Sequence, residues 1–320
     1  MKISRMFSAL FLIAVAITAI AYAQDNSKKD KSKDKKTAVK LIEVKANLMV
    51  LGADGKFADD VKSEDVKIYE DGVEQKITRF VKKDSPLNAG LVVDNSGSLR
   101  PSLAEIIKAA SVIADNLEPT GEAFVMRFVS RDKIEILQDW TSKKDRLNSA
   151  LGEMYVDGGQ SAVIDALYLA AGKVLERETQ NKSKRYALIL ISDGEDIDSY
   201  YKFEEMTALL KDTDIQIFIL SYANLAPKFP KESVKFSNLA AFETGGIARI
   251  LNKKRTGEEI IDALKAIVTE LKSQYILNYV STNQKRDGNL RKLTVQIADG
   301  AAGEKRQSVI REGFIVPEEK

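Results

Sequence analysis

The 320-residue sequence contains no histidine and no cysteine. The lack of histidine removes the commonest general base and the usual zinc ligand. The lack of cysteine excludes disulfides and a lipoprotein anchor, so the folded chain depends on its core alone. Any metal site must therefore be built from oxygen atoms, which favours Mg²⁺, Mn²⁺ or Ca²⁺.

The sequence also has little net charge, with 49 basic and 47 acidic residues. Loss of the first 23 residues, which include Lys2 and Arg5, would leave 47 of each sign. A neutral chain offers no electrostatic footprint for a phosphate backbone, so we expect no nucleic-acid partner. Hydrophobic residues make up 44% of the chain and charged residues 30%, which is typical of a globular protein.

The N-terminus has the pattern of a secretory signal peptide over residues 1–23. Two basic residues precede an apolar run from Met6 to Ile20, and Ala21-Tyr22-Ala23 follows as a small-x-small cleavage site. The run is shorter than the ~20 residues that a membrane-spanning helix needs. We expect export to the periplasm or the extracellular space, with no membrane span after cleavage; an uncleaved anchor is the alternative. Residues 24–40 are lysine, aspartate and serine with almost nothing apolar, which predicts a disordered charged linker.

The rest of the chain divides into a β segment, an α/β segment and a second β segment. Residues 41–86 alternate apolar and polar positions around two Asp-Gly turns, at 54–55 and 71–72, which predicts short strands and hairpins. Residues 87–274 alternate apolar runs with helical patterns, which predicts a doubly wound, mostly parallel sheet. The expected strands there are 88–93, 123–129, 187–191 and 217–222, with 133–137 at an edge; the expected helices are 102–117, 144–154, 162–178 and 258–274.

Strand patterns return over residues 275–317, at 275–280, 293–297 and 309–316. We therefore predict an α/β domain that is inserted into a small β-sandwich made by the N- and C-terminal segments.

Three polar loops are expected at one edge of the predicted sheet. The first, Asp94-Asn95-Ser96-Gly97-Ser98, follows an apolar strand, and ligands of open α/β sheets bind at the carboxyl ends of strands. Read alone, it is also an ordinary solvent-facing turn. The second, Asp157-Gly158-Gly159-Gln160-Ser161, precedes a helix, so Ser161 is either a hydroxyl ligand or an N-cap. The third is Ser192-Asp193-Gly194-Glu195-Asp196, in which we expect Glu195 and Asp196, with Asp198, to form a solvated acidic rim.

Together these loops resemble the metal-ion-dependent adhesion site of von Willebrand factor A (VWA) domains. The resemblance implies that Asp94, Ser96, Ser98, Ser161 and Asp193 bind one divalent cation, Mg²⁺ before Mn²⁺ or Ca²⁺. It also implies that neighbouring residues support or border the site: Asn95, Gly97, Gly159, Asp165, Gly194 and Glu195. The family has threonine in the second loop, whereas here Gln160 is inserted and Ser161 stands in its place.

The flanking segments resemble exported bacterial VWA-related proteins. The segments that carry this resemblance are Val66–Gly72, Lys272–Tyr275, Arg286–Gly288 and Arg311–Phe314. The resemblance implies a non-enzymatic binding protein that recognises an Asp or Glu carboxylate of an unidentified partner through the cation. The alternatives are a metal-dependent hydrolase or phosphotransferase and a structural domain with an empty site. An aspartyl-phosphate enzyme of the haloacid type would have a second aspartate at position 96, where this chain has serine, and no phosphate-binding Gly-Lys motif or nucleophile elbow is present.

Overall fold

The α/β domain is built on a six-stranded sheet. The computed structural model describes residues 41–82, 86–117, 119–181, 184–211, 213–226, 228–252, 254–301, 303–316 and 318, so the predicted signal peptide and linker lie outside the described residues. The strand order is β10 (Ala248–Ile250), β9 (Gln216–Ser221), β8 (Arg185–Ser192), β5 (Leu87–Asp94), β6 (Ala123–Phe128) and β7 (Ile134–Thr141). Every neighbouring pair is parallel except β6 and β7. The sheet is therefore mostly parallel with an edge strand at β7, as predicted, and the structure adds that this strand runs antiparallel.

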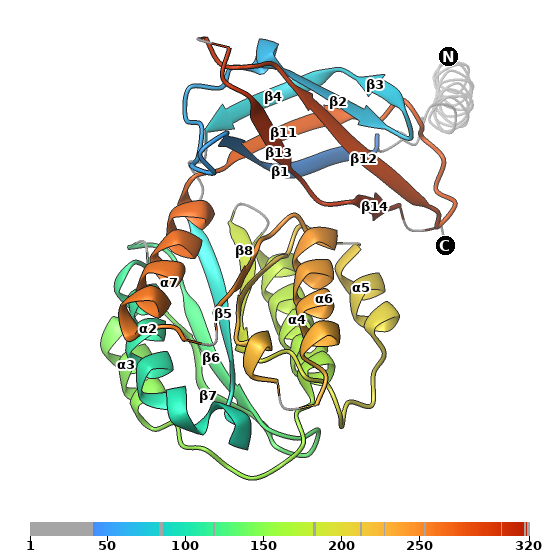
Figure 1. Cartoon of the computed structure of the whole chain (residues 1–320). Coiled ribbons are helices and arrows are strands. Elements are labelled where there is room, and N and C mark those ends of the chain that lie inside the picture. The colour runs from blue at the N-terminus through green and yellow to red at the C-terminus, as the bar shows by residue number, and fades with distance from the viewer. Residues whose placement is uncertain are drawn as a thin grey trace, which may run out of the picture. The chain divides into compact units, whose positions relative to one another are not determined.

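Helices cover both faces of this sheet (Figure 1). One layer contains α2 (Leu103–Asp115), α3 (Lys144–Gly152) and α7 (Gly257–Lys272), and the other contains α4 (Val163–Gln180), α5 (Phe203–Lys211) and α6 (Pro230–Glu243). Short 3₁₀ helices lie at Ser63–Asp65, Gly97–Ser102 and Ala223–Leu225. Two layers over a parallel sheet explain why its central strands are apolar without alternation.

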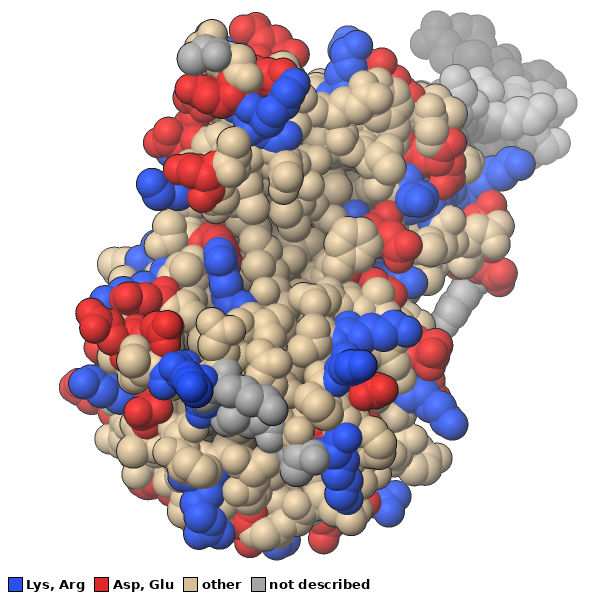
Figure 2. Space-filling model, in the orientation of Figure 1, with Lys and Arg blue, Asp and Glu red and all other residues tan. Residues whose placement is uncertain are grey.

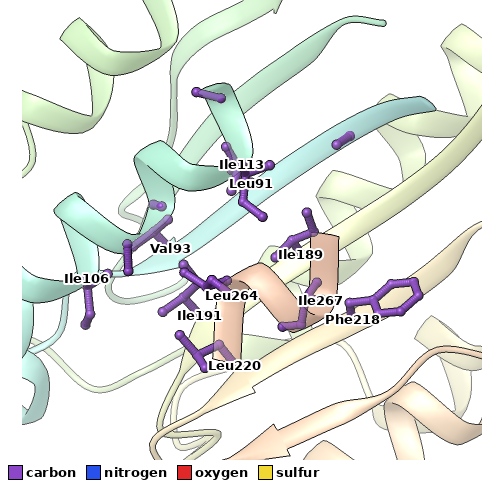
Figure 3. Packing of buried hydrophobic residues seen from close by; sticks show 14 of the residues in the cluster. Leu91, Val93, Ile106, Ile113, Ile189, Ile191, Phe218, Leu220, Leu264 and Ile267 are labelled. Carbon is purple, nitrogen blue, oxygen red and sulfur yellow. The ribbon is translucent and has the colours of Figure 1, made fainter. Parts of the chain in front are cut away.

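The central strands alternate their side chains between the two layers. Leu91 and Val93 of β5 pack toward α2 and α7, where they meet Ile106 and Leu264, whereas Val92 packs into the opposite layer (Figure 3). Each of these side chains is fully buried. Burial of one such aliphatic side chain stabilises the fold by about 1.5–3 kcal/mol, so this core fixes the strand ends that carry the polar loops.

Two four-stranded antiparallel sheets form the β-sandwich. One has the order β13 (Arg306–Val309), β1 (Glu43–Gly52), β11 (Tyr275–Val280), β4 (Ile77–Lys82). The other has the order β14 (Gly313–Ile315), β12 (Leu290–Ile297), β2 (Val66–Glu70), β3 (Val73–Gln75). Each sheet combines strands from before and after the α/β domain, and their inner faces share one core that contains Leu48, Ile68, Tyr279 and Leu293. The predicted fold class, an α/β domain inserted in a sandwich, is confirmed.

The prediction of one strand over residues 309–316 is wrong. β13 ends at Val309, β14 begins at Gly313, and the two strands belong to different sheets. The chain crosses between the sheets at residues 310–312, where the Arg311 guanidinium donates to the carbonyl oxygens of Thr213 (2.8 Å) and Lys45 (3.0 Å). Apolar residues lie on both sides of the crossing, at Val309 and Ile310 and again at 314–316, so the segment resembled one strand despite the charged pair between them.

The surface of the described residues carries charges of both signs. On the face shown in Figure 2, basic and acidic side chains are interspersed rather than gathered by sign. Among the described helices, none combines the length and the hydrophobicity that a membrane span requires.

Candidate functional site

The first and third polar loops leave neighbouring parallel strands at the same edge of the sheet. β5 and β8 pair in register from Leu87 and Arg185 up to Val93 and Ile191. Asp94 ends β5 and Ser192 ends β8, so the residues after them emerge side by side. The second loop is tied to the first, because the Asp157 N–H donates to the carbonyl oxygen of Asn95 at 3.0 Å.

Asp94 lies at the centre of the three loops and is fully buried. Its Oδ1 accepts a hydrogen bond from the Ser96 backbone N–H at 2.8 Å. Its Oδ2 accepts from the hydroxyls of Ser161 at 3.1 Å and Ser192 at 2.7 Å. One carboxylate therefore contacts residues of all three loops.

The three predicted hydroxyl ligands lie around this carboxylate. The Oγ atoms of Ser96 and Ser98 are 3.0 Å apart. Ser161 is not an N-cap: α4 is capped by Ala162 without a side-chain bond, and the Ser161 hydroxyl donates to Asp94 instead. The ligand interpretation of Ser161 thus fits the geometry better than the capping interpretation.

Asp193 completes the set of five. It is buried, with Oδ1 accepting the Glu195 backbone N–H at 3.0 Å. An open hollow lies beside these groups. Its lining combines residues of the three loops with Ile197, which follows the third loop, and Lys228 from a fourth segment: Ser96, Gly97, Ser98, Gly159, Gln160, Ser161, Asp193, Glu195, Ile197 and Lys228.

The two carboxylates are electrostatically unfavourable as anions in this position. Burial, and after it the negative charge of Asp193, raises the pKa of the Asp94 carboxyl to about 6. Burial also raises the pKa of Asp193, although a hydrogen bond from Ser98 opposes the shift. A cation at this point would reverse both effects, since opposite charge favours the ionised form.

The donor set fits a hard divalent ion. Two carboxylates and three hydroxyls offer only oxygen, the donor that Mg²⁺ and Ca²⁺ prefer. Among the described residues there is no group of three or more His, Cys, Asp or Glu side chains that could hold a metal. An ion at this position would therefore depend on the serine hydroxyls as well as on the two aspartates.

Two glycines shape the loops. A Cβ on Gly159 would lie 2.6 Å from Cγ1 of Val129, the residue after β6, so the second loop passes too close to Val129 for a side chain. Gly194 has φ of +72°, a left-handed conformation that glycine adopts without strain. Both glycines therefore permit the loop paths that bring the polar groups together. A side chain at position 97 would meet open space, so the path of the first loop does not require glycine there.

Two of the predicted supporting residues stabilise neighbouring segments. The Asn95 amide donates to the Tyr155 carbonyl oxygen at 2.8 Å, which links the first loop to the segment before the second. Asp165 accepts the backbone N–H groups of Tyr200 (2.9 Å) and Tyr201 (2.8 Å). Asp165 thus fixes the chain that follows the third loop rather than one of the five predicted ligands.

The expected solvated rim is wrong for Glu195, which is buried, whereas Asp196 and Asp198 are half-buried. Glu195 is only 4% exposed, and its carboxylate accepts two backbone N–H groups of the segment before α6. Asp196 accepts from Ile164 N–H and the Ser199 hydroxyl, and Asp198 pairs with Arg131 at 3.3 Å. Backbone N–H groups satisfy buried carboxylates well, and no local pattern in the sequence reveals such distant partners.

Sequence reasoning also missed two residues of this region. The sequence places Ser192 in the third loop without a role of its own. Its buried hydroxyl donates to Asp94 and accepts from the Gly194 N–H at 2.9 Å. Its position at the end of a buried strand, directly before Asp193, was the available signal. Lys228 comes from a segment with no motif, so nothing in the sequence pointed to it.

Residues 90–241 match the family model of the von Willebrand factor type A domain. The chain contains a VWA domain. VWA domains generally mediate protein–protein interactions, and most are not enzymes. No curated protein matches the sequence significantly.

Several solved structures are similar to this chain at low sequence identity. An aerotolerance-related membrane protein from Bacteroides fragilis, solved with multiple mutations to serine, is 17% identical and covers 58% of this chain and 98% of its own, with a TM-score of 0.46. The conserved hypothetical protein BatB from Bacteroides thetaiotaomicron is 15% identical, with coverages of 58% and 100% and a TM-score of 0.46. A von Willebrand factor type A protein from Catenulispora acidiphila is 11% identical, with coverages of 87% and 75% and a TM-score of 0.45.

Proposed function

We propose that the chain is an exported, non-enzymatic protein that binds a partner through a divalent cation, Mg²⁺ before Mn²⁺ or Ca²⁺. The proposed ligands are the hydroxyls of Ser96, Ser98 and Ser161, which bind directly, and the carboxylates of Asp94 and Asp193, which bind directly or through water. The group recognised is an Asp or Glu carboxylate of the partner protein. Export is supported by the signal-peptide pattern of residues 1–23.

The observation that supports the proposal most directly is the environment of Asp94. A fully buried carboxylate contacts three serines and lies beside a second buried carboxylate. Burial of paired anions is costly unless a cation or strong donors compensate. Here the donors are neutral hydroxyls and one backbone N–H, which leaves the negative charge in place.

The residues of the site have separate tasks in this proposal. Asp94 and Asp193 balance the two charges of the ion, while the serines contribute neutral oxygen. When bound, the ion would supply a coordination position at which a carboxylate oxygen replaces water, an exchange that suits Mg²⁺ because it commonly keeps several waters. In this proposal both aspartates bind the ion, so neither is free to act as a general base, and the chain has no histidine or cysteine, which supports binding rather than turnover.

Calorimetric titration of the purified protein with Mg²⁺ and Mn²⁺ tests the cation. We expect one ion per chain for the wild type and no binding for Asp94→Asn, which keeps the shape of the side chain but removes its charge. The matched control is Asp157→Asn, which deletes the same charge from the second loop at a residue that pairs with Lys133 (2.9 Å) outside the hollow. This control should bind the ion like the wild type.

The partner requires a separate test. Proteins captured from an envelope extract with Mg²⁺ and released by chelator are the expected partners, and the Asp94→Asn protein should capture none of them. Wild-type protein that binds no divalent ion would contradict the cation proposal. Capture that is unaffected by chelator would contradict the carboxylate–cation mode of binding.

A further inference from the structure

A fourth segment, outside the three polar loops, contributes a basic side chain to the hollow. Lys228 precedes α6 and is the one lysine or arginine among the residues that line the hollow. Its side chain is exposed, and it forms no ion pair with any carboxylate of the described residues. A positive charge thus stands at the edge of a site whose other charged groups are acidic.

The position of Lys228 is fixed by Glu195. The Oε1 atom of this buried carboxylate accepts the backbone N–H groups of Lys228 at 2.7 Å and Phe229 at 2.9 Å. Glu195 lies two residues after Asp193, so the lysine backbone is attached to the same loop that supplies a proposed ligand. Pro230 then starts α6 with a restricted φ. The Lys228 side chain can still rotate, but the backbone from which it starts is held in place.

The charges around the hollow leave this ammonium group available to a ligand. A divalent ion would balance Asp94 and Asp193, and Glu195 is already engaged by two backbone N–H groups. Glu195 keeps its negative charge but forms no ion pair with Lys228, which is the one ammonium group in the lining next to the position where a partner carboxylate would bind. A cation and an ammonium group side by side favour a ligand with two negative charges.

We propose that Lys228 is a specificity-determining residue that pairs with a second carboxylate of the bound partner segment. The ligand class is a peptide with two acidic groups close together, either adjacent Asp or Glu residues or an acidic residue at a C-terminus. Glu195 acts as the positioning residue for Lys228. The inference rests on the proposed function, since the first carboxylate needs the cation.

Short synthetic peptides test the preference. The probes are the capped peptides Ser-Gly-Asp-Gly-Ser and Ser-Gly-Asp-Asp-Ser, together with Ser-Gly-Ser-Gly-Asp with a free C-terminus, each titrated into the Mg²⁺-saturated protein at low salt. We expect the two-carboxylate probes to bind up to about fivefold more tightly than the single-carboxylate probe, the range of an exposed ion pair. The preference should shrink as salt is added. The relative affinities of the second and third probes distinguish an internal acidic pair from a chain end.

Variants assign the preference to Lys228. Lys228→Gln should bind all three probes equally, and Glu195→Gln should reduce the preference because its amide accepts the two N–H groups less strongly. Lys231→Gln is the matched control, since it removes an exposed lysine from α6 that does not line the hollow, and it should keep the full preference.

The outcomes separate the two proposals. Wild-type protein that binds Mg²⁺ and the single-carboxylate probe but shows no preference overturns the role of Lys228 alone. A preference that survives in Lys228→Gln does the same. Wild-type protein that fails to bind Mg²⁺, or binds it but no acidic probe, overturns the proposed function and this inference with it.

Discussion

Asp94 affects both the proposed binding of a cation and the stability of the fold. Its carboxyl has a pKa raised to about 6 by burial and by Asp193, against an ordinary value of 3.8. The folded state therefore binds a proton more tightly than the unfolded state does. The stabilisation from this group is complete below pH 4 and is lost as the pH rises through 6.

This shift predicts the effect of Asp94→Asn without metal. In chelator at pH 7.5 we expect the variant to be more stable than the wild type by roughly 3 kcal/mol, because it lacks the buried charge, and equally stable at pH 4. Urea unfolding at the two pH values measures the difference. Addition of Mg²⁺ should reverse the order at pH 7.5, since only the wild type gains stability from bound ligand. Equal stabilities in chelator at both pH values would show that Asp94 does not titrate in this way.

The sequence predicted individual site residues where a short motif follows a buried strand. The strand ends at Asp94 and Ser192 are set by apolar runs, and the three loops follow a known family order. Glu195 and Lys228 lay beyond such reasoning. Their arrangement depends on hydrogen bonds between segments more than thirty residues apart, and those are determined by the packing of α6.

At the scale of elements, the path of the second loop depends on its close approach to Val129, directly after β6. Gly159→Ala would place a Cβ 2.6 Å from Val129 Cγ1, so the loop must move and carry Ser161 with it. We expect Mg²⁺ affinity to fall about tenfold or more, as is typical when a supporting residue of a metal site is changed. Calorimetry measures the loss.

Val129→Ala provides the matching control. It removes the Cγ1 atom that the new Cβ would meet, so the double variant Gly159→Ala, Val129→Ala should regain most of the affinity. Additive losses in the double variant would mean that the clash does not explain the effect, because residues in contact are expected to couple.

Two helices, α5 and α6, were absent from the predicted elements, and α6 shows why. Its buried face includes Ser233 and Ser237 beside Ala240 and Ala241, so the apolar period is diluted. The Ser237 hydroxyl is satisfied by the Ser233 carbonyl oxygen and lies 2.9 Å from the Ser221 hydroxyl at the end of β9. Hydroxyls that bond within a helix can be buried at low cost, but they remove the signal that periodicity detects.

At the scale of the whole molecule, the chain holds a single tryptophan, Trp140, which lies on β7 and packs edge-on against Phe124. Its fluorescence therefore reports on the VWA domain, whereas far-UV circular dichroism also reports on the sandwich. We expect the two unfolding transitions in urea to coincide. Tyr275 of β11 is the cross-strand partner of Lys82 of β4. If the α/β domain unfolded while the sandwich stayed folded, this pairing would have to close a very long loop.

The entropic cost of closing that unfolded loop is roughly 5 kcal/mol, which is comparable to the free energy of unfolding of a small domain. Contacts such as Arg311 with Asp214, at 3.1 Å, add to the coupling between the sandwich and the α/β domain. A fluorescence transition at clearly lower urea than the circular dichroism transition would show that the sandwich persists alone.

The insertion itself was predictable because strand patterns occur on both sides of the α/β segment. Which strands pair with each other in the two sheets could not be predicted. β1 pairs with β11 and β13, and β2 pairs with β12, and nothing in a local pattern distinguishes these partners from those within each terminal segment. Pairings of this kind are selected by complementary faces and chain connections, which only the assembled core provides.

The place of β1 between β11 and β13 has a consequence for the newly made chain. Both of its neighbours are synthesised after the whole VWA domain. Until the ribosome has released those C-terminal strands, an apolar strand with two open edges has no partner in its own sheet. Such a strand is prone to pair with other chains. We therefore expect the newly made N-terminal segment to need protection from aggregation until β11 and β13 have been synthesised.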